Sequence, residues 1–412
     1  MTRRQTDVSR DASLICVVAF LRSASVGVVG VVLAIYLGAH GVSVSATGLV
    51  IGAGLAGGTV ATALVSLRGD RFGRRRSLIA LAGLTAFGYV GLAATTHLTA
   101  LLPLAFVGTL NGMGRDRGAA AALEQAILPE TTEAARRTWV LAWYNVVLDA
   151  GHAIGALGGV VPTLLASRLQ IGDGDAHRLV FLMCAAAATV GIAPYAALSR
   201  RIEIASPAIA GPAAPRVGPH ARSAVAKLAL LFGIDSVGGG FLSSALIAYW
   251  FFRRYGVSER DLAILFFAAR ILNALSHVAA AWIARRIGLL NTMVLTHVPS
   301  SVFLMAAPAA GSAAVAGALF LAREALVEMD VPTRQSYVMA IVRPHERTFA
   351  SGVTNVTRNV GWAVGPSLAG LVMQRVALAG PLFIGGALKI TYDFLLYFSF
   401  RHIRPPEEDG QA

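Results

Sequence analysis

The side chains of this 412-residue chain that are best suited to chemistry are ionisable groups inside long apolar runs. One run, RSASVGVVGVVLAIYL, begins with Arg22, and a second, DSVGGGFLSSALIAYW, begins with Asp235. When Tyr36 is aligned with Tyr249, the two opposite charges share one position. A charge inside hydrocarbon is costly, so each needs a partner and marks a candidate site. The two charges either pair with each other, as a switch or a static salt bridge, or act separately. In the second case Asp235 takes a proton or a cation, and Arg22, with the two tyrosines, binds an anionic solute.

A second group lies at Asn145, Asp149 and His152, which follow one another at i, i+4 and i+7. This spacing puts all three on one face of a helix. A carboxylate beside an imidazole exchanges protons near neutral pH, because burial and neighbouring charges readily shift both groups. Asp149 and His152 are therefore the leading candidates for proton coupling, and a hydrogen-bonded packing cluster is the alternative.

The densest group of charges lies between residues 323 and 334. Its deep members are expected to touch the path of a solute, with Glu324 as a proton carrier and Arg323 as a solute-binding group. Asp330 and Arg334 lie nearer the end of the segment, beside the helix-breaking Pro332. Salt bridges of a gate or of an interface are expected there.

Two further polar stripes are expected to face inward, because arginine at this depth avoids lipid. They consist of Arg270, Asn273 and His277, and of Asn355, Arg358 and Trp362. Arg270 and Arg358 are candidates for binding the solute, and Arg358 is also a candidate partner for a carboxylate of residues 323–334.

Three other ionisable residues are expected to be structural. Lys389 and Asp393 are spaced at i and i+4, so they can neutralise each other on one helix. His297 stands alone in its apolar run and is expected to serve packing.

The elements that must position these groups are long apolar helices. The chain is 56% hydrophobic and only 14% charged, and its mean hydropathy is +0.65. About 20 apolar residues span a bilayer as a helix. Twelve such spans are predicted: 13–37, 46–67, 77–97, 99–119, 138–166, 177–198, 225–250, 260–284, 288–308, 311–333, 347–372 and 380–400.

The Pro-, Gly- and Arg-rich stretch 199–224 divides the spans into two sets of six. The expected organisation is an N-terminal six-helix bundle (1–198), a cytoplasmic linker (199–224) and a C-terminal six-helix bundle (225–412). The halves also repeat: Gly151 and Gly155 align with Gly361 and Gly365. Duplicated helical halves around a mid-membrane site are typical of secondary transporters.

The formal net charge of +13 predicts orientation rather than nucleic-acid binding. The basic residues concentrate in the tails and in alternate loops, which places both termini in the cytoplasm by the positive-inside rule. The partners expected from this distribution are anionic membrane lipids, and no nucleic acid.

Enzyme motifs are missing from the sequence. It has no P-loop, no H-E-x-x-H, no C-x-x-C and no G-x-S-x-G. We therefore expect no enzyme activity, no cofactor and no bound metal. The two cysteines, Cys16 and Cys184, lie in apolar runs and form no disulfide framework.

The loop SLRGDRFGRRRSL (66–78) provides candidate gating residues. Gly73 can supply the turn, and Asp70 can accept the free N–H groups at the positive end of another helix. A plain basic topology loop is the alternative. The segment Arg115-Asp116-Arg117, at the end of the fourth predicted span, is assigned to the cytoplasmic gate together with Asp330.

This loop resembles the signature of the major facilitator superfamily, G-x-x-x-D-R-x-G-R-R-x. Five positions match and Ser66 replaces the family's first glycine; the matches are Asp70, Arg71, Gly73, Arg74 and Arg75. A decayed copy, ARRIGLLNT (284–292), keeps Gly288, and residues 329–370 resemble bacterial, efflux-like members.

The resemblance implies two six-helix bundles that rock around a central cavity lined by the first, fourth, seventh and tenth helices. It also implies that Asp70 stabilises the outward-open state by bridging to the eleventh helix. The expected function is proton-coupled export of a small polar or charged solute across the cell inner membrane, by a monomer. An uncoupled facilitator, an importer and a non-transporting sensor are the alternatives.

Overall fold

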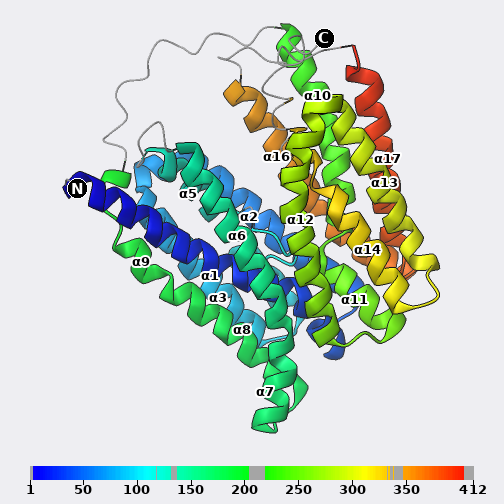
Figure 1. The fold of residues 1–412 in the computed structure, drawn as a ribbon. Helices are drawn as coiled ribbons and strands as arrows, with labels where there is room; N and C mark the ends of the chain where they lie inside the picture. The colour runs from blue at the N-terminus through cyan, green and yellow to red at the C-terminus, as the bar shows by residue number, and fades with distance from the viewer. Residues whose placement is uncertain are drawn as a thin grey trace. The chain divides into compact units, whose positions relative to one another are not determined.

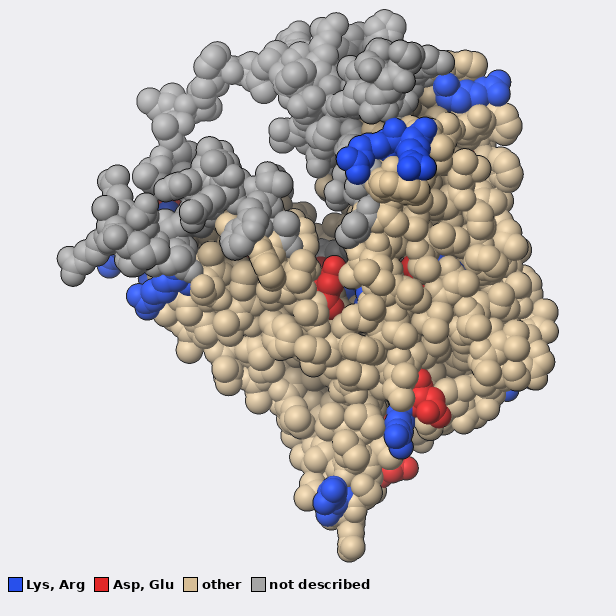
Figure 2. All heavy atoms as spheres, viewed as in Figure 1, with Lys and Arg blue, Asp and Glu red and all other residues tan. Residues whose placement is uncertain are grey.

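The computed structural model describes residues 3–116, 118–130, 137–203, 219–331, 333–334, 337 and 347–402. All regular elements in these ranges are helices, as the sequence predicts (Figure 1). Nine of them are long and apolar enough to cross a membrane. The described face in Figure 2 carries few charged side chains. Exposed Phe87, Leu230 and Phe398 are examples of side chains suited to lipid contact.

Residues of the chain divide into two units. The first comprises Met1–Ala210 and Ser243–Phe267, and the second comprises Gly211–Leu242 and Ala268–Ala412. The helices of the first unit are α1 (Arg3–Ala39), α2 (Val44–Phe72), α3 (Arg74–Ala94), α4 (Leu98–Val107), α5 (Ala119–Glu130), α6 (Arg137–Leu157), α7 (Val161–Leu169), α8 (Asp173–Val190), α9 (Ile192–Ala196) and α11 (Ser244–Tyr255). Those of the second are α10 (Pro219–Phe241), α13 (Leu289–Ala306), α14 (Ala313–Val327), α16 (Arg347–Arg375) and α17 (Gly380–Phe400), while α12 (Glu259–Ile287) begins in the first unit and ends in the second.

This division differs from the boundary expected at the linker, because residues 243–267 belong to the first unit. The physical reason is a break in the seventh predicted span: α10 ends at Phe241 and α11 begins at Ser244. The start of α11 then packs in the first unit, where the Ala245 amide donates to the Gly112 carbonyl at 3.2 Å. Most of the predicted linker (204–218) lies outside the described residues.

Small residues bring α6 onto α1 and α16 onto α10 at equivalent positions. A Cβ added at Gly151 would lie 2.7 Å from the Cβ of Ser23, and one added at Gly361 would lie 2.8 Å from that of Ser236. Small residues of this kind allow helix backbones to approach closely in membranes. The internal repeat predicted from the sequence therefore corresponds to two equivalent helix crossings.

Glycines at equivalent turns also share a backbone conformation. Gly73 and Gly288 have φ of 99° and 85°, and Gly41 and Gly256 have φ of 76° and 66°. Positive φ is readily accessible only to glycine. The turn predicted at Gly73, and its copy at Gly288, are confirmed.

The fourth predicted span is two helices, not one. After α4 the described residues 108–116 and 118 are irregular, with positive φ at Thr109 (50°) and Gly114 (70°), and α5 then runs from Ala119 to Glu130. Arg117 lies outside the described residues. Arg115 and Asp116 therefore lie within the span, between its two helical parts. Their assignment to the cytoplasmic end of a continuous helix was wrong, because the sequence was interpreted as one uninterrupted span.

Three predicted spans are not among the nine long apolar helices. The fourth is divided into the short apolar segments Leu98–Val107 and Ala119–Leu128, and the tenth corresponds to α14, with 15 residues. The eleventh corresponds to α16, which has 29 residues but includes Arg347, Arg358 and Arg375.

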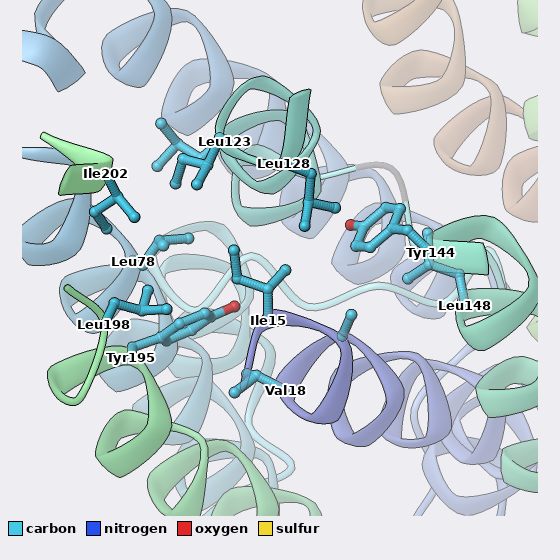
Figure 3. Packing of buried hydrophobic residues seen from close by; sticks show 12 residues of the cluster. Ile15, Val18, Leu78, Leu123, Leu128, Tyr144, Leu148, Tyr195, Leu198 and Ile202 are labelled. Carbon is cyan, nitrogen blue, oxygen red and sulfur yellow. The ribbon is translucent and has the colours of Figure 1, made fainter. Parts of the chain in front are cut away.

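The core of the first unit surrounds these elements with aliphatic and tyrosine side chains. Ile15 of α1, Leu78 of α3 and Leu123 of α5 pack together with Tyr144 and Tyr195 (Figure 3). In the second unit Phe232, Met293 and Leu396 belong to an equivalent cluster of α10, α13 and α17. The two tyrosines are relevant below, because their hydroxyl groups reach a buried charge.

The contact between α2 and α4 gives a test of this packing. A Cβ at Gly54 would lie 1.9 Å from the Leu110 carbonyl oxygen, whereas a Cβ at Gly58, one turn further along α2, meets nothing within 4 Å. Gly54→Ala should destabilise the protein by about 1–3 kcal/mol through overpacking. The measurement is the thermal unfolding midpoint of the detergent-purified protein. Gly58→Ala is the control and should leave the midpoint unchanged or raise it, and equal midpoints for the two variants would contradict this packing.

Candidate functional site

The first unit contains a buried cluster of charges centred on Arg22, which we call the Arg22 cluster. The Arg22 Nε atom donates to Asp116 Oδ2 at 2.5 Å, and Nη2 donates to Glu124 Oε2 at 2.6 Å. Nη1 donates to Glu124 Oε1 and to the Tyr195 hydroxyl oxygen, both at 2.9 Å. All three nitrogen atoms of the guanidinium thus have partners within the unit.

Glu124 is the best-satisfied member of the Arg22 cluster. Its carboxylate also accepts hydrogen bonds from the Tyr195 hydroxyl at 2.5 Å and the Tyr144 hydroxyl at 2.7 Å, and the residue has no exposed surface. Donors on both oxygens stabilise the ionised form of a buried carboxylate. Sequence reasoning missed Glu124 because the fourth span was expected to end at residue 119. Glu124 could have been identified as a candidate from the sequence, because it is the single acidic residue in the apolar run AAAALEQAIL.

His152 joins the Arg22 cluster through the backbone. Its Nε2 atom accepts a hydrogen bond from the Asp116 amide at 2.8 Å, and the side chain is buried. Asp149, one turn earlier on α6, is half-buried, and Asn145 is exposed. The described contact of His152 is therefore with the break between α4 and α5, while the predicted exchange of a proton with Asp149 stays a prediction.

The second unit contains its own buried cluster, which we call the Asp235 cluster. The Lys389 ammonium donates to Asp235 Oδ1 at 2.7 Å, and Arg334 Nη1 lies 3.4 Å from Asp235 Oδ2. Arg334 Nη1 also donates to Asp330 Oδ2 at 2.5 Å. Asp330 is thus a partner of Arg334 within this cluster.

Two residues expected to be structural belong to the same cluster. His297 Nδ1 lies 2.9 Å from Asp393 Oδ1, and His297 Nε2 lies 3.3 Å from Lys389 Nζ. The prediction that Lys389 and Asp393 neutralise each other was wrong, because each is drawn to a partner on another helix. His297, which was expected to be a packing histidine with satisfied hydrogen bonds, is buried and has these two polar contacts.

The predicted pairing of Arg22 with Asp235 would join the two units and stays a prediction. Each residue has short contacts to opposite charges in its own unit. Sequence alignment correctly placed the two residues at equivalent positions of α1 and α10, but it carried no information on Glu124 or Lys389 as competing partners.

A third polar group in the second unit surrounds Glu324. Arg323 pairs with the Glu324 carboxylate, and Asn273 Nδ2 donates to Glu324 Oε2 at 2.8 Å. Arg270 Nη1 lies 3.3 Å from Asn273 Oδ1. The structure thus brings together three of the residues predicted to bind protons or solute. On the same segments, His277 Nε2 lies 4.0 Å from Glu328 Oε2.

Arg358 lies on α16 and stacks on an aromatic ring. Its guanidinium carbon is 4.6 Å from the centroid of the Trp362 ring, and the residue is buried. A cation over an indole face is a favourable arrangement. Arg358 is buried, but Asn355 of the same predicted stripe is exposed, so the predicted inward orientation agrees with the burial of Arg358 and not with the exposure of Asn355.

The basic loop after α2 is held by an acid that the sequence analysis did not consider. Glu203 accepts hydrogen bonds from the Arg74 amide at 2.7 Å and the Arg75 amide at 3.1 Å, at the N-terminus of α3. A carboxylate at this position satisfies free N–H groups and complements the helix dipole. The side chains of Asp70 and Arg71 lie outside the described residues, so their gating role stays a prediction.

Tyr36 and Tyr249 lie in packing contacts of the first unit. Tyr36 is fully buried and stacks on His177, with ring centroids 5.7 Å apart, and Tyr249 lies against Gly38. His177 Nε2 lies 2.7 Å from Glu259 Oε1, and His177 Nδ1 lies 2.7 Å from the Asp173 carbonyl oxygen. Two oxygen acceptors require protons on both ring nitrogens, so His177 and Glu259 form a charged link between α8 and the start of α12.

These clusters can hold and exchange charge, but they do not form a metal centre. Among the described residues, no group of three or more His, Cys, Asp or Glu side chains is arranged to hold a metal ion. Buried carboxylates whose partners are arginine, lysine, histidine and tyrosine are suited to proton binding and to ion-pair exchange.

Comparison with known proteins agrees with this fold. Residues 15–366 match the family model described as Major Facilitator Superfamily. The chain therefore belongs to the Major Facilitator Superfamily, and it is a multi-pass membrane protein with the fold of that family's transporters.

Particular relatives extend along nearly the whole chain. The uncharacterized membrane protein YJR124C of Saccharomyces cerevisiae is 26% identical, covering 95% of this chain and 94% of its own. A mutant of the nucleoside transporter NupG has a TM-score of 0.77 at 13% identity, covering 95% of this chain and 100% of its own. A D-xylose-proton symporter has a TM-score of 0.71 at 14% identity, covering 95% and 97%. The bacterial, efflux-like origin expected from the sequence stays a prediction, since this curated relative is from yeast.

The Arg22 cluster gives a double-mutant test. Glu124→Gln should destabilise the protein by about 3–5 kcal/mol, because it removes one partner of a buried ion pair. Arg22→Gln should do likewise, and the double variant should lose less than the sum of the two, since neither charge is then left alone. The measurement is the thermal unfolding midpoint in detergent.

Asp175→Asn is the matched control for this cycle. Asp175 pairs with Arg178 on the surface of α8, where its side chain is 65% exposed. Exposed pairs contribute at most about 1 kcal/mol. Strict additivity of the Arg22 and Glu124 effects would contradict the pairing described here.

Proposed function

We propose that the protein is a secondary active transporter that moves a small polar or charged solute by alternating access, with proton coupling and in the direction of export. The observation that supports this most is a buried ionic cluster in each unit, at equivalent positions of α1 and α10. Ionisable groups at membrane depth are costly and occur where ions or solutes pass.

Proton coupling is proposed for the carboxylates of the second unit and for His152 with Asp149 in the first. Asp235 contacts one lysine and one arginine, and Glu324 contacts Arg323 and Asn273. A carboxylate that changes partner as the protein changes state also changes its affinity for protons. One structural relative is a proton symporter, which supports the same kind of coupling.

Solute binding is proposed for Arg270, Arg323 and Arg358 of the second unit rather than for Arg22. All three guanidinium nitrogens of Arg22 already bond to carboxylates or tyrosine, so a bound anion would have to displace a buried partner. Arg358 presents a guanidinium stacked on Trp362, an arrangement suited to planar or charged solutes. The relatives named for nucleosides and xylose support a small polar solute.

The proposed location is the cell inner membrane, with both termini in the cytoplasm. The basic tails and loops support this orientation through the positive-inside rule. In that orientation the end of α11 and the start of α12 lie at the extracellular side, and the His177–Glu259 link belongs to an extracellular gate. The export direction is supported by the resemblance of residues 329–370 to bacterial, efflux-like members of the family.

The direct test uses proteoliposomes that contain the protein and trap the pH-sensitive dye pyranine. Probe solutes are added outside as a panel of nucleosides, pentoses, aromatic carboxylates and the cation ethidium. Export by proton exchange predicts that at least one probe moves protons opposite to its own gradient, and that a protonophore abolishes this response.

Each other outcome selects a different function. Proton movement in the same direction as the probe identifies a symporter, and probe entry without proton movement identifies a facilitator. Saturable binding of a probe without entry identifies a sensor. Each of these three results would contradict proton-coupled export.

Asp235→Asn gives a residue-level prediction for the same liposomes. Asn cannot take up a proton, and it removes the negative charge that Lys389 and Arg334 share. The proton response to an active probe should therefore fall by about tenfold or more. Asp175→Asn is the control and should retain the response. A response of normal size in Asp235→Asn would remove this residue from the coupling mechanism.

A further inference from the structure

We propose that Asp393, hydrogen-bonded by His297, is a proton-binding site of the second unit. The proposal deepens and rests on the proposed proton coupling, because it names a site that receives the proton. It concerns two residues that composition and spacing indicated to be structural, and it follows from the contacts, burial and charge of six side chains.

The direction of the hydrogen bonds fixes the protonation of His297. An ammonium group only donates, so His297 Nε2, at 3.3 Å from Lys389 Nζ, must be the acceptor. The proton of the imidazole is then on Nδ1, which donates to Asp393 Oδ1 at 2.9 Å. His297 is therefore neutral when Lys389 is charged, and it then adds no charge to the cluster. The same Nε2 atom lies 3.9 Å from Asp235 Oδ1, which is too long for a hydrogen bond.

The remaining charges of the Asp235 cluster do not balance. Its three carboxylates are Asp235, Asp330 and Asp393, whereas its cations are Lys389 and Arg334. With every carboxylate ionised, one negative charge remains. Asp235 and Asp330 each contact a cation directly, while Asp393 contacts only the neutral imidazole among the residues that the structure describes. The excess charge belongs to Asp393.

The second oxygen of Asp393 is where a proton fits. Asp393 has no exposed surface, and its Oδ2 atom is buried without a hydrogen-bond partner in the described part of the chain. A buried anionic oxygen without a partner is far more costly than a neutral hydroxyl. A proton taken up on Oδ2 removes the excess charge and leaves the bond from His297 to Oδ1 intact.

The surroundings favour a proton over a metal cation. Hard cations such as Ca²⁺ and Mg²⁺ take about six or more oxygen ligands, whereas one orphaned oxygen suffices for a proton. The groups that face the dyad are Asp235 from α10, Lys389 and Tyr392 from α17, and Asp330 with Arg334 beyond α14. Arg358 of the neighbouring α16 stacks on Trp362.

The site is connected to Asp235 by a single side chain. Lys389 lies between His297 Nε2 and Asp235 Oδ1, at 3.3 Å and 2.7 Å. Transfer of a second proton to His297 would place a donor opposite the ammonium, so Lys389 would have to move away. A further proton on His297, and not the proton on Asp393 Oδ2, would thus weaken the link between α17 and α10, and α10 is the helix that ends at the break before Ser244.

Infrared difference spectroscopy of the reconstituted full-length protein tests this site without a known solute. During a pH titration around neutrality, the wild-type protein should lose a C=O band of a protonated carboxylic acid as pH rises. Asp393→Asn should lack this band, and its side-chain oxygen can still accept the bond from His297. His297→Gln should shift the midpoint of the band, and the exposed-site control Asp175→Asn should keep it unchanged.

Two results would overturn the proposal: a wild-type protein without a titrating carboxyl band, or a band that persists unchanged in Asp393→Asn. Size-exclusion elution and the thermal midpoint establish that each variant is folded, and the wild-type titration is decisive even if a variant is not. The liposome response tests the proposed transport function separately from the proton-binding site at Asp393. A titrating carboxyl band without any solute-driven proton movement would support the proton-binding site and contradict the proposed function. Solute-driven proton movement together with an unchanged band in Asp393→Asn would support the proposed function and contradict the assignment of the proton-binding site to Asp393.

Discussion

A charge buried among apolar helices must find its counter-charge nearby, and this requirement organises both units of the protein. Arg22 is surrounded by Asp116, Glu124 and Tyr195, and Asp235 is held by Lys389 and Arg334. The desolvation cost of an isolated charge is several kcal/mol, so removing one partner affects the others strongly. The clusters are therefore sensitive to protonation, and a proton or a charged solute can change which partners stay together.

The close helix crossings determine where these charges lie. Gly151 packs against Ser23 beside Arg22, and Gly361 packs against Ser236 beside Asp235. Because the crossings are equivalent, the two charges occupy the same position in the two halves of the repeat. The different partners come from other segments: the broken fourth span and α9 in the first unit, and α17 and the residues after α14 in the second.

Sequence patterns predicted the features that depend on local chemistry. Hydropathy identified the helices, Gly73 identified a turn that needs positive φ, and the aligned glycines identified the repeated crossings. The loop signature identified the family, which the match to residues 15–366 establishes. Each of these features is encoded within a few neighbouring residues.

The sequence did not predict partners that are distant along the chain. Arg22 and Glu124 are separated by 102 positions, and Lys389 and Asp235 by 154. The i, i+4 spacing suggested that Lys389 pairs with Asp393. Such spacing shows only that the two side chains lie on the same face of a helix, and it does not determine which acceptor the flexible lysine reaches. The break between α4 and α5 lies in the segment GTLNGMGRDRG (108–118). Its glycines and charged residues were interpreted as the end of the fourth span, and not as an interruption after which the span continues.

The central claim is that Arg22 and Asp235 are neutralised separately, each within its own unit. The most direct measurement is the thermal unfolding midpoint of a charge swap, in which Arg22→Asp and Asp235→Arg are made singly and together. Separate clusters predict that the double variant is about as destabilised as the sum of the single variants, because the sites share no partner. Recovery of the midpoint toward the wild-type value in the double variant would contradict the account.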